Sequence, residues 1–203
     1  MLLRRNVAVL PNAVWIDKKP LPVAQQGTAM LNEIYHQFVK DYPKYFKMDL
    51  LGKLGFLSSE LLLQGLEEER FVPRCDRSVL LFNRSASLQT DSRYQETISN
   101  PEQYYPSPAL FVYTLPNIVT GEIAIRNKYH GETSFFVLEN FDSEIIADSV
   151  IAAFQDPDCQ SQITGWMECS DETHWHAVLL LVERQGGESA EDLKCCLDSL
   201  YNL

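Results

Sequence analysis

The sequence is poor in the residues that mark fibrous, disordered or disulfide-rich chains. Its 203 residues include 9 Gly, 10 Pro and 5 Cys, too few for a collagen repeat, a Pro/Gly-rich disordered chain or a dense disulfide framework. The five cysteines are odd in number and unevenly spaced, which favours reduced thiols in mostly apolar positions. A chain of this size buries roughly 70% of its unfolded surface on folding. We therefore expect one domain over residues 1–203.

Long apolar runs and an excess of basic charge are also missing. No run approaches the roughly 20 residues of a membrane helix, and the apolar stretch near the start ends at Pro11, too short for a secretory signal. The 17 Lys and Arg face 28 Asp and Glu, a net charge of -11. Such a surface repels phosphate backbones and anionic lipids. We therefore expect a cytoplasmic protein that binds neither nucleic acid nor membranes.

Apolar periodicity predicts alternating strands and helices. Strands are expected at 7–10, 14–16, 78–82, 133–138, 163–167 and 177–183, and helices at 30–42, 50–66, 91–98, 115–127, 142–154 and 190–201. Pro43 should end the first helix, and Ser189 should cap the last one. The pattern indicates an α/β fold with a mostly parallel five-stranded sheet, one antiparallel edge strand and helices on both faces.

Residues 106–141 carry the most informative pattern. Asn117 stands at a loop that enters a helix, Gly121 lies within that helix, and Gly131 precedes the strand Thr133–Leu138. This arrangement resembles the β-ketoacyl synthase family of the thiolase superfamily.

Two further segments extend the resemblance along the chain. Lys47–Leu54 is similar to the basic-Met segment that opens the family's second helix, and Ala177–Arg184 is similar to the strand that closes its first half. The resemblance therefore implies a layered, thiolase-like N-terminal half.

The nucleophile of the resembled family is absent. In active members a cysteine comes nine residues after the glycine, where a helix N-terminus can stabilise its thiolate. Counting from Gly131 gives Asn140, and the nearest cysteine is Cys159. The family's two catalytic histidines belong to a second half, whereas this sequence ends at Leu203 after one half. The resemblance implies no catalytic residue, no metal and no cofactor, as in the non-condensing chain-length factors.

The resemblance also suggests binding surfaces. Asn117, Phe111 and Phe141 are its candidate substrate-binding residues. The family's dimer pairs the strand before the nucleophile across a two-fold axis, here Thr133–Leu138. We expect a homodimer, or a heterodimer with a ketosynthase, in fatty-acid or polyketide-type biosynthesis. Acyl carrier proteins are acidic, so the net charge favours only indirect contact with one.

The sequence leaves three other functions open. A separate chain carrying the second half could complete a 3-oxoacyl-[acyl-carrier-protein] synthase. The chain could bind an acyl chain without catalysis, with the polar loop Ser85–Asp91 beside the ligand, because ligand loops follow buried strands in α/β sheets. A Cys–His hydrolase could pair Cys159 or Cys169 with His130 or His176, although no nucleophile motif surrounds either cysteine.

One cluster has metal-binding residue types but not the usual spacing. His174 and His176 lie close to Cys169 in the sequence. Zinc sites usually pair Cys-x2–4-Cys with His-x3–5-His, and neither spacing occurs here. A polar turn that runs into a strand accounts for the same residues.

Overall fold

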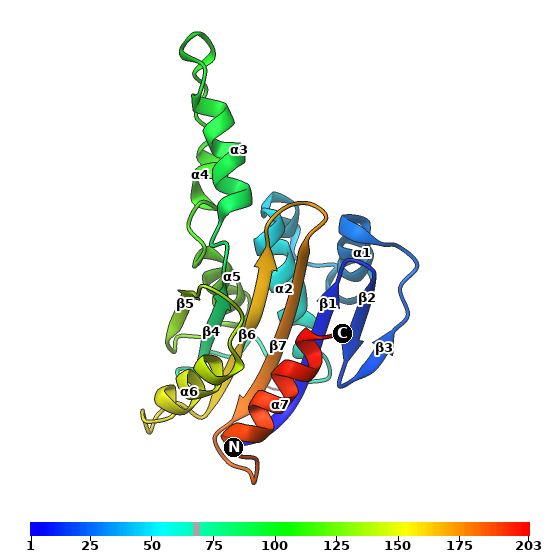
Figure 1. Ribbon diagram of the computed structural model, residues 1–203, viewed down its shortest axis with the longest axis vertical. Coiled ribbons are helices and arrows are strands. Elements are labelled where there is room, and N and C mark those ends of the chain that lie inside the picture. The colour runs from blue at the N-terminus through cyan, green and yellow to red at the C-terminus, as the bar shows by residue number, and fades with distance from the viewer. Residues whose placement is uncertain (67–69) are drawn as a thin grey trace.

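The computed structural model describes residues 1–66 and 70–203, which form one mixed sheet with helices on both faces (Figure 1). The strand order is β3-β2-β1-β7-β6-β4-β5. The strands are β1 (Leu2–Leu10), β2 (Ala13–Ile16), β3 (Lys19–Leu21), β4 (Arg77–Asn83), β5 (Thr133–Val137), β6 (Ser161–Cys169) and β7 (Trp175–Glu183). The helices are α1 (Gly27–Ile34), α2 (Leu50–Leu62), α3 (Leu88–Ile98), α4 (Pro108–Val112), α5 (Ile118–Asn127), α6 (Ser143–Ala153) and α7 (Ala190–Tyr201).

The prediction of a mostly parallel five-stranded sheet is wrong. The sheet has seven strands, and β4 makes the two parallel pairings, with β5 and β6. The other pairings are antiparallel. The expected antiparallel edge strand rests on the short connection between the strands at 163–167 and 177–183. These strands, β6 and β7, do pair antiparallel, but they lie in the middle of the sheet. A short connection between neighbouring strands requires them to run antiparallel.

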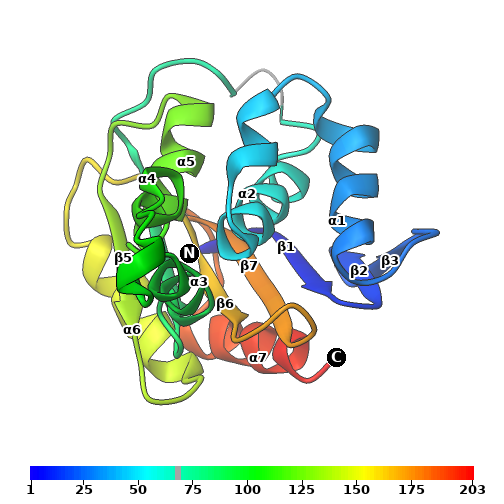
Figure 2. The same ribbon diagram turned by 90° about the horizontal axis from the view of Figure 1, so that it is seen from above.

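Two apolar cores lie on opposite faces of the sheet. The first packs α1, α2 and α5 against the sheet, and α2 is buried on nearly all sides, as its sequence predicts. The second packs α6 and α7 against the other face. Figure 2 shows these two helix layers with the sheet between them. No helix among residues 1–66 and 70–203 is long and apolar enough to cross a membrane.

The ends of the helices differ in places from the predictions. The first helix continues α1 as a π-helical turn, Tyr35–Val39, and ends at Lys40, whose φ is 67°. The backbone, rather than Pro43, therefore ends this helix. The last helix begins as predicted, because Ser189 and Asp192 form a reciprocal capping box.

An arm formed by α3, a 3-10 turn (Pro101–Gln103) and α4 projects beyond the sheet (Figure 1). Several large apolar side chains of the arm and of the segment that follows it are exposed: Leu88, Tyr104, Tyr105, Phe111, Val112 and Leu115. The apolar side of α6 is covered, since α6 and α7 lie side by side over the same face of the sheet. Strand β5 adds two further exposed apolar side chains, Phe136 and Val137.

Candidate functional site

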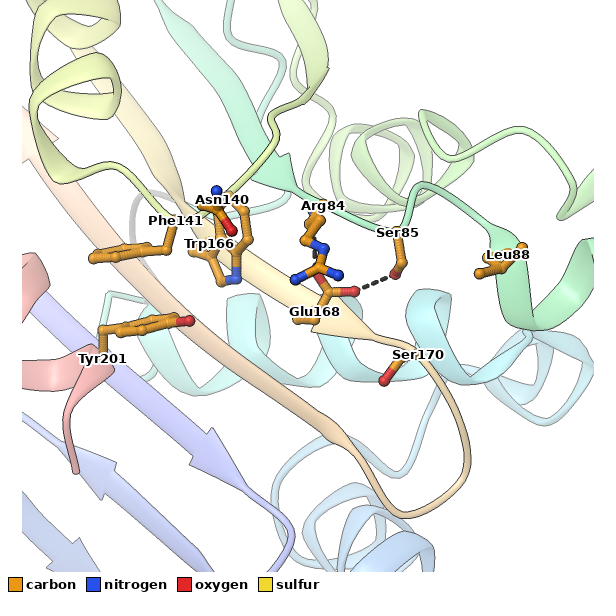
Figure 3. A pocket seen from close by; sticks show the side chains of 9 residues that line it. All are labelled: Arg84, Ser85, Leu88, Asn140, Phe141, Trp166, Glu168, Ser170 and Tyr201. Carbon is orange, nitrogen blue, oxygen red and sulfur yellow. Dashed lines mark hydrogen bonds between the residues drawn. The ribbon is translucent and has the colours of Figure 1, made fainter.

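A cavity of about 540 Å³ opens at the carboxyl ends of β4, β5 and β6. This is the edge at which α/β sheets usually bind ligands. Its wall is made by residues from five parts of the chain (Figure 3): Arg84, Ser85, Leu88, Asn140, Phe141, Trp166, Glu168, Ser170 and Tyr201. The cavity therefore depends on the tertiary fold and not on one motif.

Glu168 ties the loop after β4 to strand β6. Its carboxylate accepts hydrogen bonds from the backbone N–H of Arg84 (2.9 Å) and from the hydroxyl of Ser85. Within the loop, the side chain of Asn83 donates to the carbonyl of Ala86 (2.8 Å) and accepts from its N–H (3.0 Å). The loop is thus held at both ends, and Arg84 and Ser85 have fixed backbone positions at the cavity.

Aromatic rings make the opposite wall. Phe141 stacks on Tyr201 with 3.9 Å between ring centroids and meets Trp166 edge-on at 5.7 Å. Tyr201 also contacts the ring of His176 at 5.2 Å. Burial lowers the pKa of His176. Because Tyr201 ends α7, the C-terminal helix contributes directly to this site.

Asn140 lies in the turn between β5 and α6 and lines the cavity. Asn140 does not cap α6, because Asp142 is the N-cap and accepts from the N–H groups of Glu144 and Ile145, both at 3.0 Å. The Asn140 side chain is exposed. No cysteine or histidine is among the residues that line this cavity.

The three candidate substrate-binding residues are not brought together. Phe141 lines the cavity, whereas Phe111 lies on the arm with its ring 5.5 Å from that of Tyr94. Asn117 is exposed in the turn before α5 and makes no capping hydrogen bond. Sequence reasoning missed Trp166 and Tyr201.

Of the pairs proposed for a Cys–His hydrolase, Cys169 and His176 are separated by the sheet. Cys169 lies in the core beneath α2, while His176 faces α7 on the other side of the sheet. Burial raises the pKa of the Cys169 thiol to about 12, so it stays protonated near neutral pH. The Cys159 sulfur contacts Ser78 and the carbonyl of Ser161. Among the described residues, no hydrogen bond joins either cysteine to a histidine.

The described part of the chain contains no group of three or more His, Cys, Asp or Glu side chains placed to hold a metal ion. The side chain of His174 contacts Asp171 at 2.8 Å in an exposed turn. This is the polar-turn arrangement that the sequence also allowed.

Solved structures with a similar architecture include ketosynthase assemblies. The chain superposes on the ishigamide ketosynthase/chain length factor with a TM-score of 0.64 and 16% identity, over 90% of this chain and 62% of that one. It also superposes on a chain of the complex of the ketosynthase ApeO with its chain length factor ApeC from Xenorhabdus doucetiae. That match has a TM-score of 0.56 and 13% identity, over 98% of this chain and 92% of that one. The chain has a thiolase-like fold.

A third match is to the AntDE:AntF complex, a type II PKS acyl-carrier protein with its ketosynthase bound to the hexaketide. Its TM-score is 0.53 at 11% identity, over 89% of this chain and 63% of that one. The sequence matches no protein-family model and no curated protein. At these identities the likeness establishes the thiolase-like fold and not an activity.

Proposed function

We propose that this chain is a non-catalytic, ketosynthase-like subunit that pairs with a ketosynthase in fatty-acid or polyketide-type biosynthesis. The observation that carries the proposal is Asn140. It follows β5 and precedes α6, at the strand-to-helix turn where the resembled family has its nucleophilic cysteine, and it lines a cavity. An amide side chain cannot form the thiolate that condensation requires.

The length of one similar chain supports a subunit of this size. The match to the ApeO–ApeC complex spans 98% of this chain and 92% of the other. A chain of nearly this length therefore occurs in a complex of a ketosynthase with its chain length factor. The other two matches span less than two thirds of their chains.

The open edge of the sheet supplies a surface for the partner. Strand β5 pairs with β4 on one side and ends the sheet on the other. It exposes Val137 to 52% and Phe136 to 40%. An unprotected, apolar edge strand is a template for pairing with another chain. This exposed edge supports the proposal that Thr133–Leu138 is the dimer strand.

A charged side chain on β5 should weaken the pairing of this chain with a ketosynthase. We expect the Val137→Asp variant to bind a co-expressed ketosynthase at least about tenfold more weakly than the wild type, because a carboxylate would be buried without a partner. The measurement is co-purification followed by sedimentation of the complex, with the ketosynthase from the same gene neighbourhood. Val72→Asp is the matched control, since Val72 is exposed to 54% and lies outside the sheet.

Two outcomes would contradict this assignment of the surface. One is that both variants weaken the complex equally. The other is that the wild-type chain sediments as a monomer and forms no complex with the ketosynthase at micromolar concentration. If the wild-type chain is instead a homodimer that Val137→Asp dissociates, β5 remains the interface and the partner is a second copy of this chain.

The composite enzyme is the weaker alternative. A second half that completed a site at Asn140 would have to approach α6, the helix that follows Asn140. The outward sides of α6 and α7 instead expose the carboxylates Glu144, Asp148, Glu191 and Asp198. Lys194 pairs with Glu191 at 2.6 Å and lies near Glu144 and Asp148, but burying the carboxylates that no cation pairs with would be unfavourable. We therefore expect this charged surface to stay exposed to water and not to be covered by a second half.

We therefore expect no covalent acyl intermediate on this chain. Incubation with an acyl thioester should leave its intact mass unchanged, while the ketosynthase partner in the same mixture gains the acyl mass. Mass spectrometry of the separated chains measures both. A stable adduct on any of the five cysteines would overturn the non-catalytic assignment and favour the composite synthase or the Cys–His hydrolase.

A further inference from the structure

The cavity beside Asn140 contains a buried hydrogen-bond donor without an acceptor. Trp166 is only 2% exposed, and its Nε1 atom has no partner among the described residues. Figure 3 shows this nitrogen on the side of the ring that faces Arg84 and Glu168. Buried indole N–H groups usually find a partner. An unpaired one at a cavity wall indicates a place for a ligand oxygen.

The charge of the cavity narrows the ligand further. Both oxygens of Glu168 are already engaged, by Ser85, by the backbone N–H of Cys169 (3.2 Å) and by that of Arg84. The Arg84 side chain is exposed at the rim and forms no ion pair with the described residues. Among the polar groups left for a ligand, the Trp166 indole and the Arg84 guanidinium are donors only, and the latter is a cation, while Asn140 and Tyr201 can donate or accept. Guanidinium and N–H donors together favour a carboxylate.

The remainder of the cavity is suited to an apolar group. Phe141 and Tyr201 form the aromatic wall, and a second cavity of about 370 Å³ continues past Tyr201 toward Val178 and Leu200. The two cavities share Glu168, Ser170 and Tyr201 in their walls. Ligand sites typically have volumes of about 300–1,000 Å³ and apolar walls with a few fixed polar groups.

The geometry points to a binding site for an apolar monocarboxylic acid, whose carboxylate accepts from Trp166 and Arg84 while its hydrocarbon body lies against Phe141 and Tyr201. The inference needs only the cavity of this chain and does not depend on pairing with a ketosynthase. It can therefore fail without affecting the proposed subunit role, and the reverse also holds.

Calorimetric titration of the purified chain with three ligands tests the site. Octanoate carries the charge, octan-1-ol lacks it, and S-octanoyl-N-acetylcysteamine presents an uncharged thioester carbonyl as a carrier-bound acyl group would. We expect octanoate to bind at least about tenfold more tightly than either neutral ligand, because a charge-assisted hydrogen bond contributes that much. Equal binding of the three ligands, or no binding of octanoate below its micelle concentration, would overturn the assignment.

Two variants separate the site from unspecific binding. Arg84→Gln should weaken the binding of octanoate about tenfold and leave the binding of the thioester unchanged. Arg93→Gln is the matched control, because Arg93 is also exposed but does not line the cavity. Equal losses in the two variants would overturn the role of Arg84. Both positions are exposed, so neither change threatens the fold.

The indole proton of Trp166 gives a direct reading. Its NMR resonance, assigned by its loss in Trp166→Phe, should move progressively as octanoate is added to the wild type. The other two tryptophan indole resonances act as internal references. A Trp166 resonance that stays in place while octanoate binds would place the acid elsewhere.

Discussion

Replacing Gly165 by alanine should cost about 2–6 kcal/mol of the free energy of unfolding, the sum expected for overpacking and backbone strain. Gly165 lies in the middle of β6, opposite Leu179 of β7, with φ at 142°. A Cβ atom there would stand 2.0 Å from the carbonyl oxygen of Val178 and 3.0 Å from the Cα of Leu179. Both obstacles are backbone atoms, so the two strands would have to separate.

Gly187→Ala is the matched control, since nothing lies within 4 Å of a Cβ at that position. Denaturant titration of both variants, with the wild type alongside, measures the difference. Separation of β6 from β7 would also displace Trp166, the next residue. We therefore expect Gly165→Ala to lower both the denaturation midpoint and the affinity for octanoate. Equal midpoints for the two variants would show that the strands accommodate the methyl group.

The positions of most strands and helices follow from local patterns, whereas their directions do not. The unbroken apolar run at 78–82 predicts β4, whose residues are all buried. β3 is only three residues long and follows a turn in which Asp17 and Lys18 both have positive φ. A turn of this type forms a hairpin, but neither residue is a glycine or asparagine that would reveal it. The added hairpin and the position of β7 next to β1 make the sheet mixed.

The candidate site was only partly predictable for a related reason. Phe141 could be found because it neighbours Asn140 in the sequence. Trp166 and Tyr201 reach the same cavity from β6 and α7, and neither stands in a motif. Thr164, Trp166 and Glu168 are every second residue of β6 and therefore lie on the same side of the strand. They place polar atoms on a face otherwise covered by apolar side chains. That alternation was the available signal, but it does not identify the partners across the cavity.

Removing the charge of Glu60 should destabilise the protein by about 3–5 kcal/mol, the usual cost of breaking a buried ion pair from one side. Glu60 lies on α2, is 4% exposed, and contacts the guanidinium groups of Arg70 and Arg126, the latter at 3.3 Å. Arg70 also donates to the side chain of Asn127 (3.0 Å), which is fully buried. In Glu60→Gln, Arg70 would keep its buried position and lose its counter-charge.

The same network fixes the end of α5 from which the chain continues into β5. Asn127 is the last residue of α5 and donates to the carbonyl of Ile123 at 2.9 Å. Arg126 retains Asp41 at 2.6 Å, where its guanidinium holds the pKa of that carboxyl below its usual value. Arg126 is therefore expected to tolerate the change better than Arg70. Loss of the Glu60 charge should loosen the approach to β5 and so weaken partner binding as well as stability.

Glu191→Gln is the control, because its salt bridge with Lys194 lies on the surface of α7. We expect its denaturation midpoint to equal that of the wild type, as exposed pairs contribute little. The double variant Glu60→Gln with Arg70→Met should recover part of the loss, since it removes the uncompensated charge together with its partner. Two results would show that the buried charge does not anchor α5. One is that Glu60→Gln unfolds at the same denaturant concentration as Glu191→Gln. The other is that the double variant loses more free energy of unfolding than the two single variants together.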